Sequence, residues 1–220
     1  ASPLADRLRP KTLDEIVGQR HLLAPGRPLR KIIENGEIPN MVFYGPSGVG
    51  KTTLARYIAR QTNKKLCKLN GTTASTADIR KIVESIGTLD AVNGILLYLD
   101  EIQYFNKKQQ QTLLEFIENG DITLIASTTE NPYFYVYSAI LSRSTVFEFK
   151  IVTPEEVIPA VERAFRFLSE ERGEEISVSE KAIQLIATAC GGDVRKAMNA
   201  AELCALSAAG KDGALVVTEE

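Results

Sequence analysis

The chain has 220 residues, of which 44% are hydrophobic and 25% charged, a balance typical of a folded globular protein and not of a disordered or fibrous one. Its formal net charge is −2, so any contact with nucleic acid would have to use a local patch. No apolar run approaches the length that spans a membrane. The cysteines Cys67, Cys190 and Cys204 are far apart in apolar surroundings, which favours reduced core residues of a cytosolic protein over a disulfide framework or a metal site.

The first two thirds of the chain alternate between strand-like and helix-like runs. Helices are predicted at residues 28–35, 52–61, 77–86, 107–119 and 138–143. Strands are predicted at residues 41–44, 66–69, 95–99, 122–127 and 146–149. This alternation predicts an α/β fold, in which a mostly parallel five-stranded sheet is covered by helices on both faces.

The pattern changes after Thr153-Pro154. Residues 154–170, 179–190 and 193–209 all show helical spacing, and strand-like runs are not apparent. We therefore predict a nucleotide-binding core at residues 1–152 and a small all-α lid domain at residues 153–220. The chain starts at Ala1 without Met and stops at Thr218-Glu219-Glu220, which resembles the first turn of a helix, so we expect a C-terminally truncated fragment of a longer protein.

Residues 45–52 match the phosphate-loop motif G-x-x-x-x-G-K-[ST] at every fixed position. The motif lies between a predicted strand and a predicted helix, which is the context that it requires. Its glycines let backbone N–H groups point at phosphate oxygens, and the helix N-terminus favours negative charge. Lys51 is expected to reach the β- and γ-phosphates, and the Thr52 hydroxyl to ligate Mg²⁺. The residues assigned to the nucleotide are Gly45, Pro46, Ser47, Gly48, Val49, Gly50, Lys51, Thr52 and Thr53. The alternative is a glycine-rich turn with a chance Lys-Thr pair.

Two acids follow the third predicted strand. Asp100 is placed where a carboxylate at a strand end holds the metal, and Glu101 where it accepts a proton from the attacking water. An acidic strand end that caps a loop is the alternative. The fourth strand ends in hydroxyl and amide residues, and we favour Thr128 as the group that orients the water, with Thr129 and Asn131 as alternatives. A role in stabilising the turn stays open.

Two arginines have features of phosphate ligands. Arg143 follows a predicted helix and is suited to stabilising a transferring phosphoryl group from a neighbouring subunit, although it also fits an ordinary surface residue. Arg195 lies in the first turn of the last helix, after the predicted N-cap Asp193, where it opposes the helix dipole. This unfavourable interaction with the dipole suggests that Arg195 binds a phosphate. The alternative is that Arg195 is an ordinary solvated charge. Ile16 and Val17 offer a small apolar surface that would cover an adenine ring or dock an N-terminal arm.

Taken together, these motifs resemble the AAA+ ATPases of the clamp-loader branch and, within it, the replication-associated recombination protein A (RarA/MgsA) family. The resemblance covers nearly the whole chain and is most specific where Thr-Thr-Glu-Asn-Pro at residues 128–132 is followed by Leu-Ser-Arg at residues 141–143. It implies that Lys51 and Thr52 are Walker A, that Asp100 and Glu101 are Walker B, and that Thr128 is sensor 1. It also implies that Arg143 is a trans arginine finger, Arg195 is sensor 2, and Ile16 and Val17 border adenine.

Two positions need separate comment. The resemblance implies a switch role for Asn70, which would couple Glu101 to DNA. The histidine that family members carry after the acidic pair is replaced by Gln103 in this sequence, which puts a DNA-coupling role at that position in doubt. The DNA-facing candidates are Arg80, Lys81, Lys107 and Lys108, each of which also fits a solvated helix face.

The resemblance implies a cytoplasmic, nucleoid-associated, DNA-dependent ATPase that uses ATP and Mg²⁺ at stalled replication forks. Expected partners are fork or gapped DNA, replication proteins such as single-strand-binding protein, and further copies of the chain, in a tetramer built by additional domains. The alternatives are a Holliday-junction branch-migration motor or clamp-loader subunit, a protein-remodelling chaperone, and a scaffold that binds nucleotide without hydrolysis. Residues 70–94 lack the aromatic pore residue of a chaperone, and Glu101 and Arg143 argue against a scaffold.

Overall fold

The computed structural model describes residues 2–207, 209–211 and 214–217. The chain divides into two compact units. We call residues 20–46 and 51–149 the sheet unit, and residues up to 19, residues 47–50 and residues from 150 onward the helical unit. Within the described residues, no helix is both long enough and apolar enough to cross a membrane.

The sheet unit contains five strands. These are β1 (Met41–Tyr44), β2 (Lys65–Asn70), β3 (Ile95–Asp100), β4 (Ile122–Thr128) and β5 (Thr145–Glu148). Their order is β2-β3-β4-β1-β5, and every pairing is parallel, which confirms the predicted sheet. Tyr44 pairs with Thr128, and Asn70 pairs with Asp100. The carboxyl ends of neighbouring strands therefore lie at one edge of the sheet.

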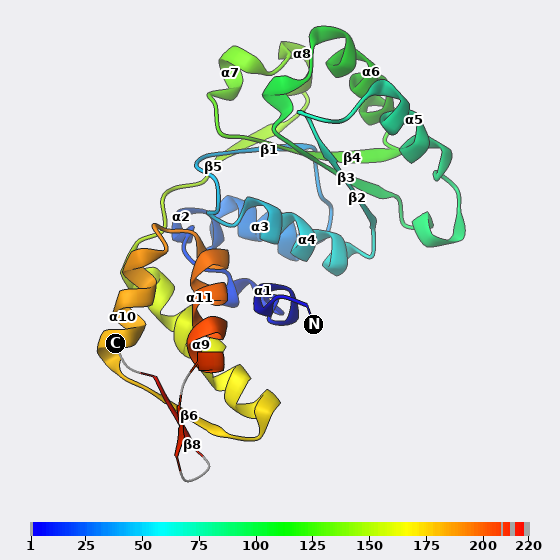
Figure 1. Cartoon of the computed structure of the whole chain (residues 1–220). Helices are drawn as coiled ribbons and strands as arrows, with labels where there is room; N and C mark the ends of the chain where they lie inside the picture. Colours follow the sequence, from blue (N-terminus) through cyan, green and yellow to red (C-terminus); the bar gives the residue numbers. More distant parts are fainter. Residues whose placement is uncertain (1, 208, 212–213, 218–220) are drawn as a thin grey trace. The chain divides into compact units, whose positions relative to one another are not determined.

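Helices cover both faces of this sheet (Figure 1). One face carries α3 (Pro28–Asn35) and α4 (Lys51–Thr62), preceded by the short α2 (Arg20–Leu23). The other face carries α5 (Thr76–Glu84), α6 (Lys107–Glu118), α7 (Pro132–Tyr135) and α8 (Ser138–Leu141). Short 3-10 turns lie at Leu89–Ala91 (η2) and Ile102–Tyr104 (η3). Asn106 caps α6 by accepting a hydrogen bond from the Gln109 N–H, which explains why that helix begins where it does.

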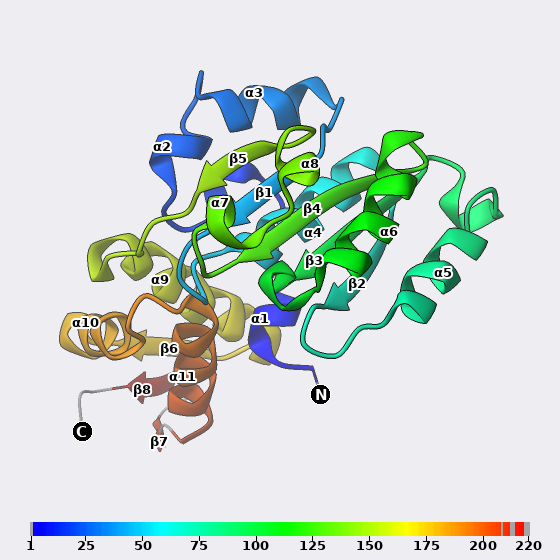
Figure 2. The same ribbon diagram turned by 90° about the horizontal axis from the view of Figure 1, so that it is seen from above.

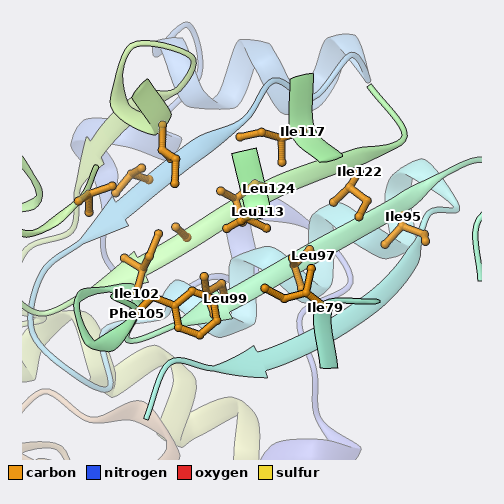
Figure 3. Packing of buried hydrophobic residues seen from close by; sticks show 14 of the residues in the cluster. Ile79, Ile95, Leu97, Leu99, Ile102, Phe105, Leu113, Ile117, Ile122 and Leu124 are labelled. Atoms are coloured by element: carbon orange, nitrogen blue, oxygen red, sulfur yellow. The ribbon is translucent and has the colours of Figure 1, made fainter. Parts of the chain in front are cut away.

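The core of the sheet unit is aliphatic. Ile95 to Leu99 of β3 are all buried, because this inner strand is covered on both faces and needs apolar side chains on each. Leu113 and Ile117 of α6 lie in the same cluster as Leu124 of β4, as Figure 3 shows. At the carboxyl end of β3, Ile102 and Phe105 belong to this cluster too, so the loop after the acidic residues is anchored in the core.

The helical unit is built on α9 (Pro154–Arg172), α10 (Glu180–Ala189) and α11 (Val194–Ser207), joined by α1 (Leu4–Arg7) and η1 (Leu13–Glu15). The residues up to Gln19, which the sequence assigns to the core at residues 1–152, group with this unit. Leu4 of α1 is fully buried, and Arg7 forms ion pairs with Glu171 of α9, at 3.0 Å, and Glu202 of α11, at 2.6 Å. The division into a nucleotide-binding core and a lid stays a prediction.

The prediction that this part of the chain is all-helical is wrong. Strand β6 (Glu175–Val178) pairs in parallel with β8 (Ala214–Val217), which pairs in antiparallel with β7 (Ala209–Lys211) (Figures 1 and 2). Sequence inspection missed β6 because four alternating residues give little signal and the partner strand lies far along the chain. The proposed helical turn at Thr218-Glu219-Glu220 lies outside the described residues.

Leu113→Ala should test the core. Removal of this fully buried side chain leaves a cavity between α6 and the sheet, and should lower the free energy of unfolding by about 2–5 kcal/mol. Urea denaturation measures the loss. Gln111→Ala, at an exposed position of the same helix, is the matched control, and an equally small effect of both substitutions would contradict the packing described.

Candidate nucleotide site

The phosphate loop starts where β1 ends. Gly45 donates its N–H to the Thr128 carbonyl oxygen at 3.1 Å, which joins the loop to the end of β4. A Cβ atom on Gly45 would lie 2.2 Å from the carbonyl oxygen of Phe149, and its φ is +153°, so only glycine fits there. Helix α4 then begins at Lys51. The strand, loop and helix that the motif requires are therefore present.

Lys51 is buried, with 6% of its surface exposed. Its ammonium group donates hydrogen bonds to the carbonyl oxygens of Gly45 and, at 3.3 Å, Thr128. Burial lowers the pKa of Lys51, and the charges of Asp100 and Glu101 oppose that shift. A polyanion bound beside the ammonium group would replace the solvation that the lysine has lost.

The hydroxyl of Thr52 is oriented by Tyr98. Thr52 Oγ1 donates to Tyr98 Oη at 3.1 Å, and burial raises the pKa of Tyr98 to about 12, so the phenol stays protonated at neutral pH. A threonine that donates its proton to Tyr98 keeps its lone pairs for a cation. We did not single out Tyr98 from the sequence, although it carries the one polar side-chain atom of Ile95–Leu99.

Asp100 is the last residue of β3, and Glu101 follows it. Strand β3 pairs with β4, which in turn pairs with β1, the strand before the phosphate loop. Glu101 adopts a left-handed conformation, with φ 58° and ψ 48°, which a non-glycine residue rarely takes. Gly71 supports this conformation of Glu101. Its N–H donates to the Asp100 carbonyl oxygen at 2.7 Å, and a Cβ atom there would lie 2.1 Å from the Glu101 carbonyl oxygen.

The carboxylate of Glu101 is hydrogen-bonded to Gln103, whose Nε2 donates to Oε2 at 2.7 Å. Asn70, the residue for which the resemblance implies this coupling, instead accepts from the N–H and hydroxyl of Thr72 through Oδ1. The partner of the proposed base is thus Gln103, the position at which this sequence departs from the family pattern. The departure is visible in the sequence, whereas the contact depends on the fold.

The residues at the end of β4 are engaged in turns. Thr128 is fully buried, and its Oγ1 accepts from the Glu130 N–H at 3.0 Å, while Asn131 accepts from the Tyr133 N–H as the N-cap of α7. The turn-stabilising interpretation of Thr128 therefore has direct support. Its main-chain carbonyl nevertheless contacts Lys51, so this residue does lie beside the phosphate loop. Thr129 is exposed.

Arg143 follows α8 and is exposed. Its guanidinium forms an ion pair with Glu118 at 2.8 Å and donates to the Ala139 carbonyl oxygen at 3.0 Å. Both side chains of the pair are 44% exposed, so the pair is weak and the arginine can exchange it for another anion.

In the helical unit, Arg195 lies in the first turn of α11, as predicted. Asp193 accepts from its N–H, and the guanidinium pairs with Asp6 at 3.3 Å. Burial opposes the effect, yet Arg195 and Arg9 bring the pKa of Asp6 below its ordinary value. The carboxylates of Asp193 and Asp6 offset part of the unfavourable interaction between the positive charge of Arg195 and the N-terminal end of the helix dipole.

Residues 47–50 of the phosphate loop lie in the same unit. A Cβ atom on Gly48 would lie 2.7 Å from the Asp193 carboxyl carbon, so the loop packs closely on the start of α11. Gln19, buried and at φ 55°, donates to the carbonyl oxygens of Val49 and Lys150 at 3.1 and 2.8 Å. Ile16 is buried and Val17 half-buried in the same arm.

No group of three or more His, Cys, Asp or Glu side chains suited to a metal occurs in the described ranges. Thr52 and Asp100 are the predicted ligands, and hydroxyl and carboxylate oxygens suit Mg²⁺. Magnesium is commonly held by one or two protein groups and the phosphates of a nucleotide, so the donor set fits that cation.

The fold and the site together define a phosphate-loop ATPase with an all-parallel sheet. A family model described as the ATPase family associated with various cellular activities (AAA) matches residues 41–155, which is more than half of the chain. The chain belongs to this family.

Similarity to individual proteins is more specific. The replication-associated recombination protein A of Escherichia coli K12 is 38% identical over 205 residues, 92% of this chain and 46% of that protein. Its namesake in Bacillus subtilis 168 is 38% identical over 223 residues, 99% of this chain and 52% of that protein. The chain thus spans about half the length of these relatives. These similarities confirm the resemblance to the replication-associated recombination protein A family that the motifs indicated.

Among solved structures, the RuvB Holliday junction branch migration motor of Thermotoga maritima is 28% identical with a TM-score of 0.69. The similarity covers 88% of this chain and 64% of that structure.

Gly71→Ala should lower the rate of ATP hydrolysis at least about tenfold while ATP affinity changes little. The added Cβ would displace the Glu101 main chain, and small misplacements of a catalytic group cost large factors in rate. Steady-state turnover and nucleotide titration measure the two effects. Gly120→Ala is the control, because its φ of +82° imposes strain but its Cβ would meet no atom within 4 Å. Equal turnover in both variants would contradict the support assigned to Gly71.

Proposed function

We propose that this chain is the ATP-hydrolysing part of a DNA-dependent ATPase that maintains stalled replication forks and acts in recombination and repair. The observation that carries the proposal is the buried Lys51 ammonium at a complete phosphate loop, with the acidic end of β3 acting on its charge. The names of the relatives, replication-associated recombination protein A, support the choice of process.

The reaction converts ATP and water to ADP and phosphate. Lys51 and the loop N–H groups bind the β- and γ-phosphates, and Thr52 and Asp100 would hold Mg²⁺, which when bound neutralises phosphate charge. Water attacks the γ-phosphorus, its proton passes to the Glu101 carboxylate, and the bond to the β-phosphate oxygen breaks to leave ADP. Gln103 holds that carboxylate before the reaction.

Further residues complete the proposed site. Arg143, supplied by a neighbouring copy, stabilises the charge on the transferring phosphoryl group, and its exposure supports that role. Arg195 would reach the phosphates of its own chain after release from Asp6. Thr128 would position the water, and Ile16 and Val17 would border adenine.

The partners that we propose are fork, gapped or junction DNA, further copies in a tetramer of the longer protein, and single-strand-binding protein. The corresponding location is the cytoplasm, at the nucleoid. A branch-migration motor is the second candidate, favoured by the likeness to the RuvB motor. A chaperone function lacks support, because the segment between β2 and β3 carries no aromatic residue.

Turnover with and without DNA tests the proposal. Hydrolysis should rise when forked or gapped DNA is added, and Glu101→Gln should bind ATP but hydrolyse it at least about a hundredfold more slowly, because the amide accepts no proton from water. Nucleotide retention on a filter measures the trapped ATP. Unchanged turnover in Glu101→Gln would refute the assignment of the base, and absence of stimulation by every DNA structure would refute DNA dependence.

A mixing experiment tests the finger from a second copy. Arg143→Ala should lower turnover by about 10³-fold, and adding Glu101→Gln protein to it should restore part of the activity. In the mixture, an Arg143→Ala copy supplies an intact Glu101, and a neighbouring Glu101→Gln copy supplies an intact Arg143. The mixture is assayed where sedimentation shows assembled copies. Arg20→Ala, another exposed arginine, is the control, and failure of every mixing ratio to restore activity would contradict action between copies.

A further inference from the structure

Helix α7 exposes three consecutive aromatic side chains. Tyr133, Phe134 and Tyr135 are 67%, 81% and 51% exposed. Large aromatic side chains gain most from burial, so three of them on one exposed turn indicate a contact surface. The proposed hydrolysis uses none of them. We call these three residues and the neighbouring Tyr137 the aromatic surface.

An open hollow of about 380 Å³ lies beside this surface, and Phe134, Tyr135 and Tyr137 contribute to its lining. The one charged side chain among the residues that line it is Lys107, at the start of α6. Figures 1 and 2 show α7 next to α8, and these helices contact each other. All of these elements belong to the sheet unit.

A buried amide holds the surface in place. Gln110 of α6 is 4% exposed, and its Oε1 accepts from the Tyr137 N–H at 2.5 Å. Its Nε2 donates to the carbonyl oxygens of Phe105 at 3.0 Å and Tyr135 at 3.5 Å. The side chain of Gln110 is thus hydrogen-bonded to the main chain of both Tyr135 and Tyr137. A surface organised in advance loses little conformational freedom when a ligand binds.

The charge beside the hollow and the ring of Tyr137 is positive. Helix α6 begins with Lys107 and Lys108 and has no acidic residue in its first turn. The Lys107 ammonium lies 5.8 Å from the ring centroid of Tyr137. Residues 131–142, which include α7 and α8, carry no charged side chain. The matching ligand therefore offers flat apolar faces together with negative charge.

We propose that the aromatic surface binds single-stranded DNA. Bases stack on the rings of Phe134 and Tyr135, and the phosphates between them pair with Lys107 and Lys108. The choice of DNA rests on the proposed function, whereas the combination of rings and ammonium groups is a property of this surface. A second copy of the chain would need an acidic side chain opposite Lys107, while a phosphate accompanies every nucleotide.

Fluorescence anisotropy of a labelled oligothymidylate tests the proposal with the whole chain. Substitution of one ring by alanine, as in Phe134→Ala or Tyr135→Ala, should weaken binding by about 5- to 150-fold, the range for loss of one stacked base. Leu89→Ala is the control, since Leu89 is an exposed apolar residue of the same unit and lies outside the surface. Absence of binding by the unaltered chain, or equal binding by Phe134→Ala and Leu89→Ala, would overturn the proposal.

Matched substitutions at Phe134 separate stacking from simple apolar contact. Phe134→Trp keeps a flat ring and should bind within a factor of about 3 of the unaltered chain, whereas Phe134→Leu keeps apolar bulk without a ring and should bind like Phe134→Ala. The side chain is 81% exposed, so neither change disturbs the core. Full binding by Phe134→Leu would overturn the stacking.

Salt dependence tests the lysines. The slope of log K against log salt concentration should decrease in magnitude by about 0.7 in Lys107→Ala, the contribution of one phosphate contact on a single strand. An unchanged slope in Lys107→Ala, combined with a lower slope in Lys31→Ala on the opposite face, would place the phosphates elsewhere and overturn the proposal.

Two further measurements distinguish the alternatives. Sedimentation that shows smaller assemblies in Phe134→Ala together with lost binding would assign the surface to contact between copies and overturn the proposal. ATP turnover separates this inference from the proposed function. If DNA binding requires the rings but no DNA stimulates ATP turnover, the aromatic surface stands as a binding site and the DNA dependence of the ATPase is refuted. Stimulation that Phe134→Ala and Tyr135→Ala leave intact, with intact binding, would refute the surface alone.

Discussion

The candidate site depends on a positive charge held away from water. Lys51 is fixed by carbonyl oxygens at the start of the phosphate loop and at the end of β4, and its burial lowers its pKa. Carbonyl groups stabilise an ammonium group less than water or a polyanion does. The residue is therefore in place for a ligand with several negative charges, and the acidic end of β3 is close enough to act on it.

That placement follows from the parallel register of the sheet. Tyr44 pairs with Thr128, and Leu99 pairs with Ala126, so β1, β4 and β3 all end at one edge. Glycines then allow close approach, with Gly45 against Phe149 and Gly71 against Glu101. The left-handed Glu101 lies against Gly71, whose N–H donates to the carbonyl oxygen of Asp100 at 2.7 Å. Under the proposed function, this geometry would place the Glu101 carboxylate beside a bound phosphate without further rearrangement of the main chain.

Most of the sheet unit could be predicted from the sequence, because its signals are local. The apolar run Ile95–Leu99 and the complete phosphate motif each indicate their structure within a few residues. Strand β6 was missed, since a four-residue strand is defined by a partner that lies about 40 residues away. The ion pairs of Arg7 with Glu171 and Glu202 have no local signal either, because the partners lie far along the chain.

The side-chain partners of the site were predicted least well. Which group holds Glu101 depends on rotamers and on main-chain direction after β3, and in this structure Gln103 is the partner while Asn70 bonds to Thr72. The roles of Tyr98 and Gln110 arise from contacts between elements that are distant in sequence. Spacing in a sequence carries no direct information about such contacts.

Calorimetric titration of Mg·ATP tests the central claim most directly. The unaltered chain should bind the nucleotide, and Lys51→Ala should bind at least about tenfold more weakly, because charged hydrogen bonds to the phosphates are lost. Lys108→Ala, an exposed lysine, should bind as the unaltered chain does. Equal affinity of the unaltered chain and Lys51→Ala would contradict the role of the buried ammonium group as the main phosphate ligand.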